Sequence, residues 1–310
     1  MSRYALGLDF GTNSCRSLLV DVTSGTEIAG HVFPYPSGSD GVIADASDPN
    51  LARQNPADYL LGIEATIRGA IQEGKESDPT FNSADIIGIG IDTTGSSPMP
   101  VDAEGQALCF QQRFKDDPAA MVWLWKDHTG YKEAAQITQL SSEMRPQYLS
   151  KIGGTYSSEW WWSKILHCKN VAKDVFDAAA SWVEICDWIP AVLTGELSPQ
   201  KVKRSVCAAG HKAIFNPAWQ GLPDSDFLDT LSPGLGSLRP RLYDTAYTAD
   251  HRAGTLSPAW ARQLGLSPSV AIAVGAFDAH MGAVGAGLSQ GTLVKIIGTS
   301  TCDIMIPPND

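Results

Sequence analysis

Two short segments near opposite ends of the chain have nearly the same sequence. Residues 11–15 are G-T-N-S-C and follow an apolar run at 4–8, and residues 298–302 are G-T-S-T-C and follow an apolar run at 293–297. A glycine-led turn lined with hydroxyl groups exposes several backbone N–H groups in one direction, which makes a concave anion-binding surface. Two such hairpins, one in each half of a molecule, could hold a polyphosphate between them. The repeat therefore indicates phosphoryl transfer or nucleotide hydrolysis.

Charged residues flank the first of these turns. Asp9 ends the apolar run directly before Gly11, and Arg16 follows the turn. The Asp9 carboxylate could orient hydrated Mg²⁺ on the phosphates, because Mg²⁺ usually keeps several waters and takes few protein ligands. The alternative is an Asp that shapes the turn through nearby backbone N–H groups. Arg16 could neutralise the charge of a transferring phosphate or lie on a solvated strand face.

A second carboxylate, Asp278, stands between a strand-like segment at 270–275 and a run of small residues at 279–287. A structural role as a helix N-cap would contribute about 1 kcal/mol. The functional interpretation is a base that accepts a proton from an attacking hydroxyl, for which its oxygen must come within about 2.6–3.2 Å of that hydroxyl. The two interpretations are compatible, since the start of a helix at a sheet edge is a fixed platform.

The elements that must position these residues begin with a meander of strands. The sequence predicts strands at 4–9, 16–21 and 27–35, with a turn at 24–25. A helix is expected from Pro56, where apolar residues recur at helical spacing. The short apolar segment 86–91 is typical of a buried strand, with a loop at 92–95. The polar residues 36–55, rich in Gly, Ser, Asp and Pro, are expected to form a loop.

This order of elements predicts the fold class. Three antiparallel strands, a helix and a buried strand are how a ribonuclease H-like α/β domain begins. Residues 288–291 resemble a linker before the second glycine–threonine hairpin, and about twenty residues cannot bury a core of their own. We therefore predict one α/β domain at 1–287, with a mixed sheet flanked by helices, followed at 288–310 by a linker and the first hairpin of a second, similar domain.

The middle of the chain is rich in tryptophan. The residues concerned are Trp123, Trp125, Trp160, Trp161, Trp162, Trp182 and Trp188. Helices are expected at 119–125, 131–140, 158–170 and 185–193, the last ending at Gly195. Core packing is the ordinary role for these side chains, because aromatic residues carry large burial free energies. The alternative places one or two of them against the apolar face of a sugar.

The composition limits the class of protein. With 310 residues, 43% hydrophobic and 18% charged, the chain is typical of globular proteins. A formal net charge of −11 argues against sequence-independent binding of nucleic acid, which needs clustered Lys and Arg. The start of the chain lacks a signal-peptide pattern, no run approaches ~18 apolar residues, and the cysteines lack paired spacing. We expect a cytoplasmic protein with reduced thiols and no membrane segment.

Several motifs jointly resemble the FGGY family of carbohydrate kinases. They are D-F-G-T at 9–12, I-D-T-T-G-S at 91–96, W-K-D-H-T at 125–129, G-A-F-D-A-H-M-G-A-V-G-A-G at 275–287 and I-G-T-S-T-C-D at 297–303. The stretches 153–167 and 208–213 are more similar to the ribulose-phosphorylating members than to those acting on xylulose or glycerol. Because members of this family continue well beyond residue 310, the resemblance implies an incomplete ATP domain and an inactive isolated chain.

The resemblance also implies roles for particular residues. It implies an actin-like pair of domains in which the first binds sugar and the second binds ATP, here for ribulose phosphorylation in pentose and arabinose catabolism. Asp278 would be the base and contact the sugar, and Asp9 would orient Mg²⁺. The phosphates would be faced by Gly11, Thr12, Asn13, Ser14 and Arg16 from one side and by Gly298, Thr299 and Ser300 from the other. The sugar site would be lined by Thr94, Gly95, Ser96, Trp125, Lys126, Asp127 and Lys212.

Other interpretations stay open. A solvated loop or a surface ion pair is the alternative for Lys126, Asp127, His128, His211 and Lys212. Glu159 has a capping or structural role as its alternative to a sugar contact. The substrate could be another ketose or polyol such as xylulose. From a different class, an ATP-gated binding protein of the actin or chaperone type shares the two hairpins but would not require Asp278. A homo-oligomer is compatible with the sequence, which carries no signal for the number of subunits.

Overall fold

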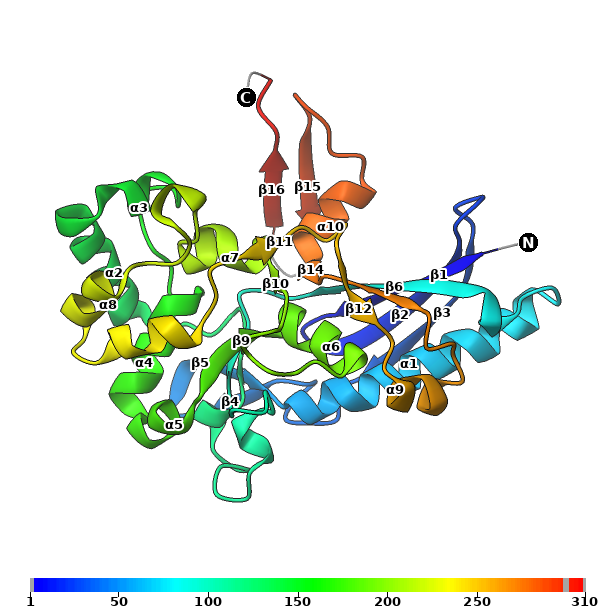
Figure 1. Ribbon diagram of the computed structural model, residues 1–310, viewed down its shortest axis with the longest axis horizontal. Helices are drawn as coiled ribbons and strands as arrows, with labels where there is room; N and C mark the ends of the chain where they lie inside the picture. The colour runs from blue at the N-terminus through cyan, green and yellow to red at the C-terminus, as the bar shows by residue number, and fades with distance from the viewer. Residues whose placement is uncertain (1–2, 298–300, 309–310) are drawn as a thin grey trace.

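The computed structural model describes residues 3–297 and 301–308. Its centre is a seven-stranded mixed sheet of order β12-β13-β6-β1-β2-β3, with β14 also paired to β6 (Figure 1). The strands are β1 (Tyr4–Phe10), β2 (Ser14–Asp21), β3 (Glu27–Pro34), β6 (Ile86–Thr93), β12 (Arg252–Thr255), β13 (Ala271–Ala273) and β14 (Ala276–Phe277). Strand β6 is parallel to β1, β13 and β14, whereas β1, β2 and β3 form the antiparallel meander. The predicted α/β class with a mixed sheet is confirmed.

The first strand and the first helix form for reasons that are visible in the sequence. Burial alternates along β1, so that Tyr4, Leu6, Leu8 and Phe10 lie in the core, as expected for a period of two. Helix α1 (Pro56–Ser77) packs across β2 and β3. The Asn55 side chain accepts a hydrogen bond from the Ala57 N–H at 3.0 Å, which caps the helix, and Ile63 and Ile67 are fully buried beneath it.

The remaining helices gather mainly at the end of the molecule opposite the N-terminus, where α2–α5 and α8 lie (Figure 1). The helices that follow α1 are α2 (Tyr131–Met144), α3 (Pro146–Ser150), α4 (Trp161–Val171), α5 (Lys173–Ala178), α6 (Ile185–Thr194), α7 (Val206–Ala213), α8 (Ser225–Leu231), α9 (Pro258–Leu264) and α10 (Asp278–Gly285). Shorter strands form further small sheets. One of them contains β4 (Ile43–Asp45), β5 (Asp48–Gln54) and β8 (Val122–Trp123). The others are two-stranded and pair β7 (Pro98–Val101) with β9 (Ser181–Glu184), β10 (Arg204–Ser205) with β11 (Ala246–Tyr247), and β15 (Leu293–Ile297) with β16 (Thr301–Met305).

Most of the tryptophans pack in the core. The fully buried ones are Trp123, Trp161, Trp162, Trp182 and Trp188. Trp123 and Trp182 meet edge to face with ring centroids 6.3 Å apart, an arrangement that aromatic pairs favour. Trp125 and Trp160 are only partly buried. The ordinary role is thus confirmed for the five buried rings, and the sugar-facing alternative is confined to the other two.

Two predicted elements are wrong, and one strand pairing explains both errors. Residues 36–55 are not one loop, because they contain β4 and β5, and residues 119–125 are not a helix, because a single 3-10 turn at Pro118–Ala120 leads into β8. Strand β5 pairs with β8, with Arg53 opposite Trp123. The polar side chains of Arg53 and Gln54 are buried there, so the local composition suggested an exposed loop where a long-range pairing makes a sheet.

The end of the described chain forms a hairpin of its own. Strands β15 and β16 pair antiparallel from Leu293 opposite Met305 to Ile297 opposite Thr301, and they stand beside α10, apart from the central sheet (Figure 1). The hairpin matches the repeat seen in the sequence, while the domain boundary at 287–288 stays a prediction. Within the described residues, no helix combines the length and apolarity needed to cross a membrane.

Candidate active site

Strand register brings three carboxylates to one edge of the central sheet. Asp9 at the end of β1 lies opposite Asp92 in β6. Asp92 in turn lies opposite Ala276 of β14, and Asp278 begins α10 two residues later. Ligands of open α/β sheets bind beyond the carboxyl ends of the parallel strands. Asp9, Asp92 and Asp278, called the carboxylate cluster below, therefore stand where a reaction site is expected.

The carboxylate cluster is electrostatically strained. Burial is the main cause that raises the pKa of Asp9, while the charge of Arg16, whose Nε lies 3.1 Å from Asp9 Oδ2, acts in the opposite direction. Burial and then the charge of Asp9 raise the pKa of Asp92 to about 8. Burial also raises the pKa of Asp278, and Asp9 adds to this. A proton or a cation at this edge would relieve the repulsion.

Asp278 does not cap its helix. The N-cap position of α10 belongs to Phe277, and Asp278 is the first helical residue. Its Oδ1 accepts a hydrogen bond from the Ala279 N–H at 2.7 Å. The side chain therefore satisfies one of the free N–H groups of the first helical turn, although it does so from the first helical position and not from the N-cap. Its carboxylate is held at the foot of a helix, at the same sheet edge as Asp9 and Asp92 and within reach of their charges.

The first glycine–threonine turn closes next to Asp9. The Gly11 N–H donates to the Ser14 carbonyl at 2.9 Å. The Thr12 carbonyl accepts from Gln54 Nε2 at 2.7 Å, and the Asn13 side chain donates to the Asp40 carbonyl at 2.6 Å. The turn is thus anchored by the end of β5 and by the segment that contains Asp40. The residues predicted to face the phosphates from the other hairpin, Gly298, Thr299 and Ser300, lie outside the described residues.

The loop after β6, residues 94–97, is the Thr94 loop. The Thr94 N–H donates to the Phe10 carbonyl at 3.1 Å, which ties the loop to the end of β1. Its Gly95 packs against the Phe277 ring so closely that a Cβ would come within 1.9 Å of the ring. The hydroxyl of Ser96 donates to Glu184, inside the protein. The structure therefore places Gly95 at the sheet edge, whereas the Ser96 side chain is enclosed.

Lys212 reaches the Thr94 loop from α7. Its Nζ donates to the Gly95 carbonyl at 2.8 Å and lies 5.2 Å from the centre of the Phe277 ring. Burial is the main cause that lowers the pKa of Lys212, and the charges of Glu184, Glu159 and Asp278 act against it. A cation is thereby placed near Asp278, and the charges of the two groups act on each other's pKa. Gly95, Lys212 and Asp278, three of the residues predicted to line a sugar site, therefore lie near one another in the structure.

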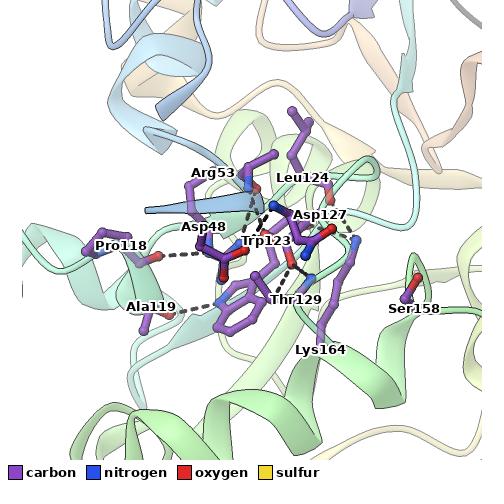
Figure 2. A network of polar contacts seen from close by, with 12 residues as sticks. Asp48, Arg53, Pro118, Ala119, Trp123, Leu124, Asp127, Thr129, Ser158 and Lys164 are labelled. Atoms are coloured by element: carbon purple, nitrogen blue, oxygen red, sulfur yellow. Dashed lines mark hydrogen bonds and ion pairs between the residues drawn. The ribbon is translucent and has the colours of Figure 1, made fainter. Parts of the chain in front are cut away.

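Residues 124–129 form the Trp125 loop, which contacts the first glycine–threonine turn. Trp125 Nε1 donates to Thr12 Oγ1 at 3.0 Å, and Lys126 beside it is half-buried. Asp127 is fully buried and pairs with Arg53, and its oxygens also accept from the N–H groups of Ala52 at 2.8 Å and Thr129 at 3.2 Å (Figure 2). The Asp127 carboxylate is therefore engaged inside the protein, and it holds the loop that presents Trp125.

Neighbouring polar residues have partners of their own. His128 Nδ1 lies 2.9 Å from Ser158 Oγ, and Glu159 is 3.9 Å from the other ring nitrogen of His128. His211 meets the Trp160 ring edge to face at 5.0 Å, and burial lowers its pKa to about 4. These contacts match the structural alternatives for His128 and Glu159.

Sequence reasoning missed three residues of this region. Asp92 was noted only as part of a motif, although it ends an apolar strand as Asp9 does, and this similarity was the available signal. Lys164 in α4 and Glu184 at the end of β9 are fully enclosed. Buried charges of this kind are rare, and no local pattern indicates them because their partners are distant in sequence.

Comparisons with known proteins define the class. Residues 4–285 match the model of the N-terminal domain of the FGGY family of carbohydrate kinases. The chain therefore belongs to the FGGY family, which confirms the resemblance drawn from the motifs. Among solved structures, it superposes on a gluconate kinase from Lactobacillus acidophilus with a TM-score of 0.74 at 19% identity, covering 98% of this chain and 54% of that one. At this identity the match shows the fold, which is that of sugar kinases with an actin-like, ribonuclease H-like domain.

Two curated relatives that the chain resembles are both ribulokinases. The chain is 43% identical over 305 residues to the ribulokinase of Vibrio parahaemolyticus, covering 98% of this chain and 53% of the relative. It is 37% identical over 312 residues to the ribulokinase of Shouchella clausii, covering 99% and 54% respectively. The chain thus spans about half the length of the curated relatives it matches.

Proposed function

We propose that this chain is the sugar-binding part of an ATP-dependent ribulokinase, which transfers the γ-phosphoryl group of ATP to the terminal hydroxyl of ribulose and gives ribulose 5-phosphate. The similarity to ribulokinases through 98% of the chain supports the substrate. The observation that carries the chemistry is the position of Asp278 at the carboxyl ends of β6 and β14, beside Asp9 and Lys212. Phosphoryl transfer depends chiefly on positioning and charge neutralisation, and this edge supplies both.

In this proposal Asp278 accepts the proton of the attacking hydroxyl. Its raised pKa makes it a better base than an ordinary carboxylate. Lys212 and the Thr94 loop hold the sugar hydroxyls from one side, and the Trp125 ring lies against the apolar face of the sugar from the other. Polyol recognition needs such paired donors and acceptors, because each polar group left unpaired in a buried site costs affinity.

The same edge suits Mg²⁺ and the phosphates of ATP. Asp9 is a partly buried carboxylate with Asp92 as its neighbour in register, and such a group is stabilised by a cation. Asp9 would hold hydrated Mg²⁺, with Gly11, Thr12, Asn13 and Ser14 facing the phosphates and Arg16 neutralising charge. The metal ion, when bound, would supply charge stabilisation on the phosphate oxygens. The second glycine–threonine turn would face the phosphates from the opposite side.

Among the rivals, a binding protein of the actin or chaperone type is not supported, since the chain belongs to the FGGY family. Another ketose or polyol is the remaining alternative. A coupled ATP-consumption assay, run on a longer protein in which this chain is followed by an ATP-binding domain of the family, separates the substrates. Ribulose should exceed xylulose, ribitol and glycerol in kcat/KM by at least about tenfold. A preference for xylulose or glycerol, or no turnover of any of the four, would refute the assignment.

A further inference from the structure

A single enclosed lysine holds the backbone of both loops of the sugar site. Lys164, in α4, is fully buried. Its Nζ donates to the carbonyls of Ser96 at 2.7 Å, Leu124 at 2.7 Å and Trp123 at 3.3 Å. Figure 2 shows the ammonium group reaching the start of the Trp125 loop. The first of these carbonyls belongs to the Thr94 loop and the second to the Trp125 loop, so one side chain spans the space between them.

Glu184 also holds the Thr94 loop, through two further hydrogen bonds. It is 1% exposed and ends β9, which pairs with β7. Its Oε2 accepts from the Ser97 N–H at 2.6 Å, and its Oε1 accepts from the Ser96 hydroxyl. Ser96 is therefore held through its carbonyl by Lys164 and through its hydroxyl by Glu184. The residue before it, Gly95, is the one whose carbonyl binds Lys212.

Burying the charged groups of Lys164 and Glu184 costs free energy that a merely structural contact would not require. Burial lowers the pKa of Lys164 well below its usual range, the charges of Lys212 and Arg53 lower it further, and Glu184 opposes them. Burial also raises the pKa of Glu184 to about 7. An apolar pair of similar volume is often as stable as a buried charged pair or more stable. Unlike an apolar residue, Lys164 binds three backbone carbonyls and thereby fixes the spacing between them.

We propose that Lys164, supported by Glu184, is a positioning residue for the sugar. It sets the separation of the Thr94 loop from the Trp125 loop, and thereby the orientation of the sugar hydroxyl toward Asp278. The inference rests on the proposed function for its kinetic consequence, whereas its structural consequence can be measured without any substrate. It predicts that loosening Lys164 impairs sugar binding selectively and leaves the backbone of the first glycine–threonine turn, which Gln54 and Asp40 hold, unaffected.

The first experiment is hydrogen exchange on the 310-residue chain and its Lys164→Met variant, which keeps an unbranched side chain one atom shorter and removes the donors. The Ser97 amide, which donates to Glu184 Oε2, and the Asp127 amide, which donates to the Leu124 carbonyl, should exchange at least about tenfold faster in the variant. The amides of β1 and β2 should be unchanged. Equal acceleration throughout the chain, or none in the two loops, would overturn the proposal.

The matched control is Lys169→Met. Lys169 lies on the same helix, one turn further on, and donates to Ser232 Oγ at 2.8 Å, away from both loops. Its variant should exchange as the wild type does at Ser97 and Asp127. Should Lys164→Met fail to fold, Glu184→Gln serves instead, because it preserves the shape of the side chain. Faster exchange confined to the Thr94 loop would support the proposal, and unchanged exchange there would contradict it.

The second experiment is kinetic and uses the longer, ATP-competent protein. Lys164→Met should raise the KM for ribulose by at least about tenfold and leave the KM for ATP within about twofold of the wild type. Equal changes in both constants would indicate a general structural role and refute the positioning role. If the wild type itself fails to phosphorylate ribulose, the proposed function fails, and the exchange experiment still decides whether Lys164 sets the spacing of the loops.

Discussion

At the scale of single residues, the site depends on carboxylates that share one edge but differ in their surroundings. Asp9 has Arg16 within 3.1 Å, Asp92 has the charge of Asp9 beside it, and Asp278 stands near both Asp9 and the Lys212 ammonium. Pairs of titratable groups with different environments are how a protein assigns different roles to chemically identical side chains. In the proposed function we assign the role of base to Asp278, because it begins a helix next to the Thr94 loop.

Replacing Asp278 by Asn tests this assignment. The amide keeps the shape of the side chain but cannot accept the proton, so kcat should fall by about 10³–10⁴-fold while ribulose affinity stays nearly unchanged. The measurement is steady-state kinetics with calorimetric binding of ribulose. Asp116→Asn, at a site whose side chain is 88% exposed, is the matched control and should retain full turnover. A turnover of Asp278→Asn within about tenfold of the wild type would remove Asp278 from the role of base.

A second residue, His211, predicts a pH dependence of stability. Burial, and then the charges of Lys212 and His280, lower its pKa from 6.5 to about 4. In the unfolded chain the ring gains a proton below about pH 6.5, whereas the folded chain resists protonation until about pH 4. The stability that the neutral ring provides is therefore complete above pH 6.5 and is lost as the pH falls toward 4.

The variant His211→Gln cannot take up this proton. The wild type should accordingly lose on the order of 2–3 kcal/mol more of its unfolding free energy than the variant does between pH 7 and pH 4. Urea unfolding at several pH values measures the difference. Parallel stability curves for the two proteins across this range would show that His211 is not held neutral by its surroundings.

At the scale of elements, the site exists because strand register is fixed. A slip of one residue would turn every side chain of a strand to the other face, and would separate Asp9 from Asp92. The close packing of Gly95 on the ring of Phe277, the last residue of β14, links the Thr94 loop to the strand that leads into Asp278. The Thr94 loop and Asp278 are thus positioned by the same contact.

Gly95→Ala tests this packing. The new methyl group would meet the Phe277 ring at 1.9 Å, so the ring or the loop must move, at a cost of about 1–3 kcal/mol. We expect lower stability in thermal unfolding and weaker ribulose binding. Gly90→Ala in β6, the strand that leads into the Thr94 loop, is the matched control, because its Cβ would meet nothing within 4 Å, and it should change stability by less than about 1 kcal/mol. Equal behaviour of the two variants would contradict this account.

The sequence predicted those elements whose signal is local. The meander β1–β3, the capped helix α1 and the strand β6 follow from the alternation and periodicity of apolar residues, and the motifs around Asp9 and Asp278 indicated the family. The prediction from sequence failed at β5 and β8. Arg53 of β5 is buried against Trp123 of β8, which lies seventy positions away in the chain, so no local pattern indicates the pairing. For the same reason the prediction did not identify Lys164 and Glu184, whose partners in the Thr94 and Trp125 loops lie far from them in sequence.

At the scale of the whole molecule, the chain presents an apolar surface beside the site. Hairpin β15–β16 and the end of α10 expose Val284, Leu293, Ile297 and Met305, each more than half accessible. A two-stranded hairpin is marginally stable by itself, and exposed apolar patches mark surfaces that associate. The relatives, of which this chain spans about half, have further chain that could cover such a surface.

The exposed surface predicts that the 310-residue chain self-associates. Leu293 and Met305 lie opposite each other in the hairpin and are 60% and 55% exposed. The double variant Leu293→Ser and Met305→Ser should shift sedimentation velocity toward the monomer at concentrations where the wild type associates. Val22→Ser, which removes an exposed apolar residue elsewhere, should have no effect. A wild type that is monomeric at every concentration would refute this prediction.

The second prediction at this scale concerns activity. The 310-residue chain should bind ribulose weakly and fail to phosphorylate it, because one hairpin does not supply the ATP-binding domain that the family uses. Calorimetry with ribulose and an assay of ADP formation, each performed on the purified chain, measure the two properties. Full turnover without any added partner fragment would contradict the division of roles between the two domains.

In the proposed function, ribulose binds at the sheet edge formed by β1, β6 and β14. The most direct test is a crystal structure of the ribulose complex, solved with the longer, ATP-competent protein. We predict that the terminal hydroxyl of the sugar lies within hydrogen-bonding distance of Asp278, with the ring of Trp125 against the carbon chain. Ribulose bound away from this edge, for example in the surface cavity of about 780 Å³ lined in part by Phe215, Trp219 and Arg239, would contradict the account.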